Sequence, residues 1–174
     1  MKTLSLPYVT NKTLKESKDK EGSLQYSAAK TILIIFTADG KDSKFHQIRR
    51  LQEKLQTDKK SVSFLYLLLR EENKPNGALD DHMIPIDKKN IGMFGDIKDG
   101  VVANTLNQKY DFVINADLYP NIYSDYLLAK SKSKCKIGRF FDDHDKFYDL
   151  MIQTNDGSDQ EYYLNQVYHY IKQL

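Results

Sequence analysis

The chain has 174 residues, of which 40% are hydrophobic and 29% are charged, and this length suits one domain with a sizeable core. Lys and Arg number 26 against 24 Asp and Glu, so the net charge of +2 argues against nucleic-acid binding driven by overall charge. One cysteine excludes an intramolecular disulfide and fits a reducing compartment, so we expect a cytoplasmic protein. The longest apolar runs, 32–36 and 64–69, are too short to cross a membrane.

The N-terminal part of the chain differs in composition from the rest. We expect a polar N-terminal arm over residues 1–28 and a single α/β domain over residues 29–174. Between Thr10 and Ser23 the only large apolar side chain is Leu14. Such a stretch buries too little apolar surface to offset its ordering entropy, which indicates a mobile arm or a surface helix.

The region from residue 31 to residue 69 has the pattern of a strand, a helix and a second strand. Residues 31–36 and 64–69 are continuous apolar runs, which are typical of strands covered on both faces. Asp42 and Ser43 are both good N-cap residues and predict that a helix begins here. Apolar side chains then recur at helical spacing, at Phe45, Ile48, Leu51 and Leu55. A strand-helix-strand unit implies parallel strands joined by a right-handed crossover.

Strand and helix patterns continue to alternate along the chain. Further strands are predicted at Met83–Ile86, Phe112–Ile114, Lys134–Arg139 and Tyr148–Ile152, and Pro85 places the first of these at a sheet edge. Helices are predicted from about Asp99 to Lys109, after Pro120, and from a Ser158-x-x-Glu161 capping box to the last residue. This alternation predicts a three-layer, doubly wound α/β sandwich of the Rossmann or flavodoxin-like kind, with a mostly parallel sheet of five or six strands.

Polar residues follow two of the buried strands, at the edge where open α/β sheets bind ligands. Asp39 and Gly40 follow the first strand, and Asn115, Asp117 and Asn121 follow strand 112–114. We take these five as candidate ligand-binding residues of a crevice. The local alternatives are a plain turn in the first loop and capping of the next helix by Asp117 or Asn121. Neither loop has the glycine spacing of a phosphate cradle, so no cofactor is predicted.

Two other features of the sequence, its acidic segments with histidine and its single cysteine, are more typical of structural roles than of a metal site or a reactive thiol. Residues 142–145 (Asp-Asp-His-Asp) and 80–82 (Asp-Asp-His) are the densest groups of metal-ligand types. Because adjacent residues rarely ligate one ion together, no metal site is predicted. Cys135 lies on a predicted strand between two lysines, and we expect a buried core cysteine rather than a reactive thiol.

The middle of the chain carries two motifs, Y-D-x-x-I-N at 110–115 and K-x-x-x-K-I-G at 132–138. Together with 147–152 and the closing helix, they resemble an uncharacterised family of small bacterial proteins known mainly from Bacteroidetes. That family has no established activity, so the resemblance implies no catalytic residues. The middle segment is also distantly similar to the N-terminal domain of lipopolysaccharide heptosyltransferases, which implies the fold. In that family a second domain supplies most of the nucleotide-sugar site, and the chain stops at Leu174, so we do not expect the transferase activity.

The sequence leaves two functions open. The leading interpretation is a protein of unknown function that acts as a non-catalytic or small-ligand-binding cytoplasmic α/β domain. The alternative is a small transferase- or hydrolase-like enzyme that acts at the crevice through Asp39, Asn115 and Asp117. The expected partner is a small-molecule ligand, with neither nucleic acid nor membrane.

We also expect a weak homodimer that uses tyrosines of the last helix. On a helical projection, Tyr163 and Tyr170 stay near the buried stripe, whereas Tyr162 and Tyr168 lie at its edges and are free to cover a partner.

Overall fold

The computed structural model describes residues 2–16, 24–74, 82–92, 95–155 and 157–174. Within these residues, six strands form one sheet: β1 (Thr31–Thr37), β2 (Ser61–Leu68), β3 (Met83–Asp87), β4 (Lys109–Asn115), β5 (Lys132–Arg139) and β6 (Leu150–Ile152). The strand order is β3-β2-β1-β4-β5-β6, and every neighbouring pair is parallel. This order is that of the Rossmann fold, which confirms the predicted doubly wound α/β architecture.

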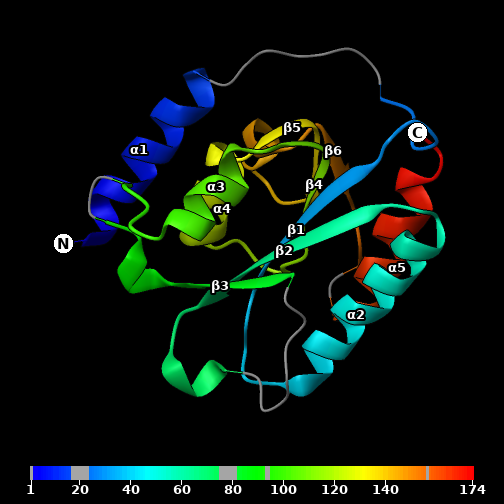
Figure 1. The fold of residues 1–174 in the computed structure, drawn as a ribbon, viewed down its shortest axis with the longest axis horizontal. Helices are drawn as coiled ribbons and strands as arrows, with labels where there is room; N and C mark the ends of the chain where they lie inside the picture. The colour runs from blue at the N-terminus through cyan, green and yellow to red at the C-terminus, as the bar shows by residue number, and fades with distance from the viewer. Residues whose placement is uncertain (1, 17–23, 75–81, 93–94, 156) are drawn as a thin grey trace.

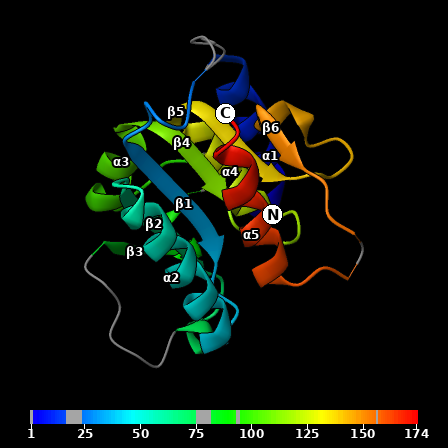
Figure 2. The same ribbon diagram turned by 90° about the vertical axis from the view of Figure 1, so that its right-hand side faces the viewer.

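Helices cover both faces of the sheet, which gives three layers (Figures 1 and 2). Side chains of β1 point alternately to the two faces, so that Ile34 and Phe36 enter one core and Leu33 and Ile35 enter the other. Burial on both faces is the reason that the strands appear as continuous apolar runs in the sequence. The face of Ile34 is covered by α2 (Asp42–Thr57) and α5 (Gln160–Ile171), and the face of Leu33 by α1 (Lys2–Glu16), α3 (Gly100–Asn107) and α4 (Ile122–Lys130).

Residues 2–16, which the sequence placed in a polar arm, form α1 against α4. Leu6 and Thr10 are both only 3% exposed, and the Thr10 hydroxyl donates to the carbonyl oxygen of Leu6 at 2.8 Å. The hydroxyl is therefore satisfied inside the contact, which lets a polar residue lie on the buried side of the helix. Residues 17–23 of the expected arm lie outside the described residues. None of the described helices has both the length and the apolar character that a membrane crossing needs.

The last helix begins later than its capping box predicts. Asp159, rather than Ser158, is the N-cap, and its carboxylate accepts the backbone N–H of Tyr162 at 2.7 Å. The expectation that Tyr170 stays near the buried stripe is wrong, because its side chain is 43% exposed. Tyr163 is fully buried, and Tyr162 is 47% exposed, as the spacing predicts. The homodimer through these tyrosines stays a prediction.

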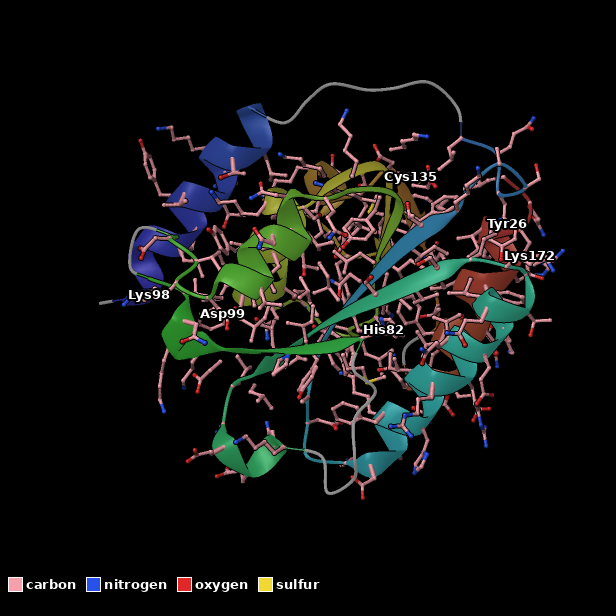
Figure 3. All side chains as sticks on the ribbon, in the orientation of Figure 1. Tyr26, His82, Lys98, Asp99, Cys135 and Lys172 are labelled. Atoms are coloured by element: carbon pink, nitrogen blue, oxygen red, sulfur yellow. The ribbon has the colours of Figure 1, made fainter. Side chains whose placement is uncertain are left out.

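Asp58, which follows α2, joins the segment before β1 to α5. Its Oδ2 accepts the hydroxyl of Tyr26 at 2.7 Å and that of Tyr168 at 2.8 Å, and it lies 3.4 Å from the Lys172 ammonium. Tyr26 and Lys172 accordingly lie close together at one end of the molecule (Figure 3). The hydrogen bond from Tyr26 is the main reason that the pKa of Asp58 is lowered, so the carboxylate stays ionised.

Candidate ligand-binding site

The carboxyl ends of β1 and β4 lie side by side where the strand order reverses. Three predicted crevice residues meet there around Thr37, the last residue of β1. Asp117 accepts the Thr37 backbone N–H and hydroxyl, both at 2.7 Å. The Asn121 amide lies 3.5 Å from the same hydroxyl, and Asn121 also caps α4 by accepting the N–H of Tyr123 at 2.8 Å. The structure therefore brings Asn115, Asp117 and Asn121 to one place.

Lys44, which was not among the predicted residues, joins this group of side chains. It lies in the first turn of α2, and its ammonium donates to the Thr37 carbonyl at 2.7 Å and to Asp117 Oδ1 at 3.1 Å. The Lys44 and Asp117 side chains are only 12% and 5% exposed. With three donors on its two oxygens, the buried Asp117 carboxylate is satisfied and holds the two loops together. No local signal in the sequence marks this pair, because its members are far apart in the chain.

Asp39 and Gly40 lie on the outer side of the β1–α2 loop. Asp39 is exposed, and its carboxylate accepts the backbone N–H of Lys41 at 3.0 Å. Gly40 has φ +76°, a conformation that favours glycine. Asn73, from the short helix η1 (Glu71–Asn73), donates to the Ala38 carbonyl at 3.0 Å, so η1 adjoins this loop. Gly40 thus adjoins η1, and Asp39 hydrogen-bonds within its own loop, so neither makes a hydrogen bond to the Asp117–Lys44 pair within the described residues.

Asn115 links Asp117 to Tyr148, whose ring packs on β5. Its Oδ1 accepts the Asp117 backbone N–H at 3.0 Å, so its NH₂ group must donate to the Tyr148 hydroxyl at 2.8 Å. The Tyr148 ring lies across Gly138 of β5, in the space that a β-carbon would occupy. Burial raises the pKa of Tyr148, so the phenol keeps its proton.

His144 turns from the acidic 142–145 segment toward α4. Its Nε2 lies 3.5 Å from Asp125 Oδ2, and its Nδ1 lies 3.1 Å from the carbonyl oxygen of Asp142. The other oxygen, Asp125 Oδ1, is buried and has no hydrogen-bond partner among the described residues. Burial raises the pKa of Asp125 to about 6, although the charge and hydrogen bond of His144 oppose the shift. In the sequence His144 stands out only as a possible metal ligand, and no local pattern connects it to Asp125.

Three or more metal-ligand side chains do not converge anywhere in the part of the chain that the structure describes. Of the second acidic segment, Asp80 and Asp81 lie outside the described residues, and His82 is exposed. The short helix η3 (Asp145–Phe147) instead gives the 142–145 segment a structural role, since it places Phe147, which is 5% exposed, below the His144 ring.

A hollow of about 340 Å³ lies over the carboxyl ends of β2 and β3. Its lining consists of three apolar or aromatic residues and four polar ones: Tyr66, Leu68 and Pro85, and Lys74, Asp87, Asn90 and Asp99. Asp99 stands at the start of α3, just before Gly100 (Figure 3). A volume of this size is within the range of small-molecule sites. The sequence analysis missed the hollow because its lining comes from separate segments that only the β2–β3 pairing unites.

The comparisons with known proteins extend over all of these elements. One family model matches residues 2–174, which takes in every strand and helix from α1 to α5. The description of that family assigns it no activity, and a search of the curated proteins returned no match. The chain therefore belongs to DUF6913, a family of unknown function.

Proposed function

We propose that this protein is a small-ligand-binding domain whose ligand occupies the hollow at the carboxyl ends of β2 and β3. The observation that carries the proposal is the hollow itself, which combines a ligand-sized volume with both apolar and polar lining residues. The hollow lies at the carboxyl edge of the sheet, the edge at which doubly wound folds bind ligands, one strand away from the point where the strand order reverses.

The lining determines the class of ligand. Pro85 is exposed and offers an apolar ring to a ligand, beside Tyr66 and Leu68, which are largely buried in the core. The charged groups of the lining are Asp87, Asp99 and Lys74, two carboxylates against one ammonium, so an anion is disfavoured. Asp99 caps α3 with Oδ1 alone, which leaves Oδ2 to accept a hydrogen bond. The ligand is therefore a flat heterocycle with hydrogen-bond donors and no negative charge, such as a nucleoside.

The crevice residues support binding rather than catalysis. An acid or base needs an oxygen that can exchange a proton with a substrate, whereas Asp117 is engaged by Thr37 and Lys44. The enzyme alternative would require this pair to separate. Asp39 and Gly40 adjoin η1, whose neighbour Lys74 lines the hollow, so a ligand longer than the hollow would reach them. The single cysteine supports a cytoplasmic location as part of the same proposal.

The proposal is tested with adenosine and AMP, which share a heterocycle and differ by a phosphate. Adenosine at millimolar concentration should raise the Tm, because a ligand that binds the folded state alone stabilises it. It should also shift the amide resonances of Asp87, Asn90 and Asp99 in a ¹H–¹⁵N spectrum. AMP should do so more weakly, because its phosphate meets two carboxylates.

A matched pair of variants locates the site. Asp99→Asn and Asp159→Asn make the same change at the N-caps of α3 and α5, and Asn is itself a good N-cap. Asp99→Asn should weaken adenosine binding about tenfold through the lost charge-assisted hydrogen bond, and Asp159→Asn should not. Equal effects of the two variants, or no response to adenosine, would overturn the proposal. Turnover of a bound compound would favour the enzyme alternative.

A further inference from the structure

The connection from β5 to β6 is attached to α4 through one imidazole ring. His144 Nδ1 lies 3.1 Å from the Asp142 carbonyl oxygen, within its own loop, and His144 Nε2 lies 3.5 Å from Asp125 Oδ2 on α4. Phe141 and Phe147 pack against the ring, at centroid distances of 6.1 and 5.6 Å. The side chain is 21% exposed, so its position is set by the protein rather than by water.

The chemistry of the two contacts limits how many protons they need. A carbonyl oxygen only accepts, so the Asp142 contact requires a hydrogen on Nδ1. The Asp125 contact requires a hydrogen between Nε2 and Oδ2, carried by one or the other. A neutral imidazole has one N–H. Neutral His144 beside an ionised Asp125 has one hydrogen for these two contacts. Both contacts therefore exist together only while the His144–Asp125 pair carries one additional proton.

We propose that His144 and Asp125 form a proton-operated latch, which holds the β5–β6 loop on α4 when the pair carries this extra proton and loosens the turn at Asp142–His144 when the proton leaves. The proposal does not depend on any ligand in the hollow. It concerns a different part of the carboxyl edge, on the far side of β4.

The direction of the release follows from the relative strengths of the two contacts. After deprotonation the remaining N–H binds the Asp125 carboxylate, because a hydrogen bond to a charged acceptor is stronger than one to a carbonyl. Nδ1 then presents a lone pair to Asp142. The turn it supported contains Asp143, whose φ of +63° is a left-handed conformation that costs energy for a residue with a side chain. Without the Asp142 contact, the turn no longer holds Asp143 in this conformation.

Charged groups around the pair act on the pKa of Asp125 in opposite directions. Asp117, from the β4–α4 loop, raises the pKa of Asp125, and Lys146 of η3 lowers it. Tyr148 faces both Asp125 and Asp117 and stays protonated, since burial and these two carboxylates raise its pKa. Burial is the largest cause at Asp125 and brings its pKa to about 6.

The wild-type protein allows a direct test by NMR. The ¹⁵N shifts of the His144 ring should show both nitrogens protonated at pH 5 and a hydrogen on Nε2 alone at pH 8. Amide exchange at His144 and Phe147, corrected for intrinsic rates, should speed up about tenfold between these pH values, the change that 1.4 kcal/mol produces. A ring that keeps its hydrogen on Nδ1 at pH 8, or exchange protection that does not change with pH, would overturn the latch.

Two variants separate the latch from general effects of pH. In Asp125→Asn the amide donates to Nε2 without an added proton, so both contacts persist and exchange in the loop should not change between pH 5 and pH 8. His169→Gln removes an exposed histidine of α5 and should leave the wild-type response intact. If amide exchange in the loop still changes with pH in Asp125→Asn, or no longer changes in His169→Gln, the His144–Asp125 pair is not the cause of the change. The wild-type titration decides the question if the Asn variant fails to fold.

Discussion

The Tyr148 ring occupies the space over Gly138 in which any other residue would place its β-carbon. The phenol thereby reaches the Asn115 amide at 2.8 Å and connects β5, β4 and the segment before β6. Gly138→Ala should destabilise the protein by about 1–3 kcal/mol, the usual result of overpacking a core, and denaturant unfolding measures the loss.

Gly100→Ala is the control for this change. Nothing lies within 4 Å of a β-carbon at Gly100, which is the first residue of α3. This variant should leave the free energy of unfolding unchanged or raise it, because alanine restricts the unfolded chain. Equal destabilisation by the two variants would contradict the role assigned to Gly138.

Lys44→Met should cost about 3 kcal/mol, because it leaves the Asp117 carboxylate buried without its charge partner. Arg50→Met breaks the exposed pair with Glu161, whose side chains are 64% and 47% exposed, and should cost less than about 1 kcal/mol. The double variant Lys44→Met/Asp117→Asn should lose less free energy of unfolding than the sum of the losses in the two single variants. Additive effects would show that the two side chains do not interact.

Acid should lower the free energy of unfolding, in part because it protonates Asp111. Burial alone would raise its pKa, but hydrogen bonds from the backbone of Lys30 and Thr31 and from the Lys134 ammonium lower it to about 2. A lowered pKa means that the folded state holds the proton less tightly than the unfolded state. The stabilisation is therefore present above about pH 4 and is lost as the pH falls toward 2.

Asp111→Asn should remove this part of the pH dependence, so that its free energy of unfolding differs from that of the wild type at pH 5 more than at pH 2. Chemical denaturation at the two pH values gives the comparison. Glu53→Gln, on the exposed side of α2, serves as the control. An Asp111→Asn effect of the same size at both pH values would show that the carboxylate is not responsible.

Cys135 should react slowly with thiol reagents. Burial, together with the charge of Asp149, raises the pKa of the thiol to about 12, and the thiolate is the reactive form. The folded protein at pH 8 should react with a disulfide reagent far more slowly than the urea-unfolded chain. Equal rates would indicate that the sheet opens readily around β5.

Local patterns were sufficient to predict a parallel sheet covered by helices, though not its strand order, and the helix α2. All four apolar residues of the predicted α2 stripe are buried, because their spacing depends only on helix geometry. The crevice was also predictable in part, since Asn115 and Asp117 follow a strand whose burial is evident in the sequence. Parallel pairing then brings them to the same edge as Thr37.

Contacts between distant segments were not predictable. Lys44 looks like a solvated residue beside an apolar stripe, and only the closeness of β1 and β4 gives it Asp117 as a partner. Asp125 and His144 meet because the loop after β5 folds back on α4. The burial of α1 was not predictable for a different reason: its buried residues include Thr10, a polar residue whose hydroxyl is satisfied within the helix.

The place of α5 in the core has a consequence for synthesis of the protein. Its Tyr163 and Val167 complete the same core as Ile34 and Ile114, which lie in the two central strands. A ribosome makes β1, β2 and β4 well before residues 160–171 leave its exit tunnel. During that interval one side of the nascent sheet lacks half of its cover and exposes branched apolar side chains, which chaperones bind and which promote aggregation. We therefore expect the yield of native protein to depend on how quickly translation proceeds from β4 to α5.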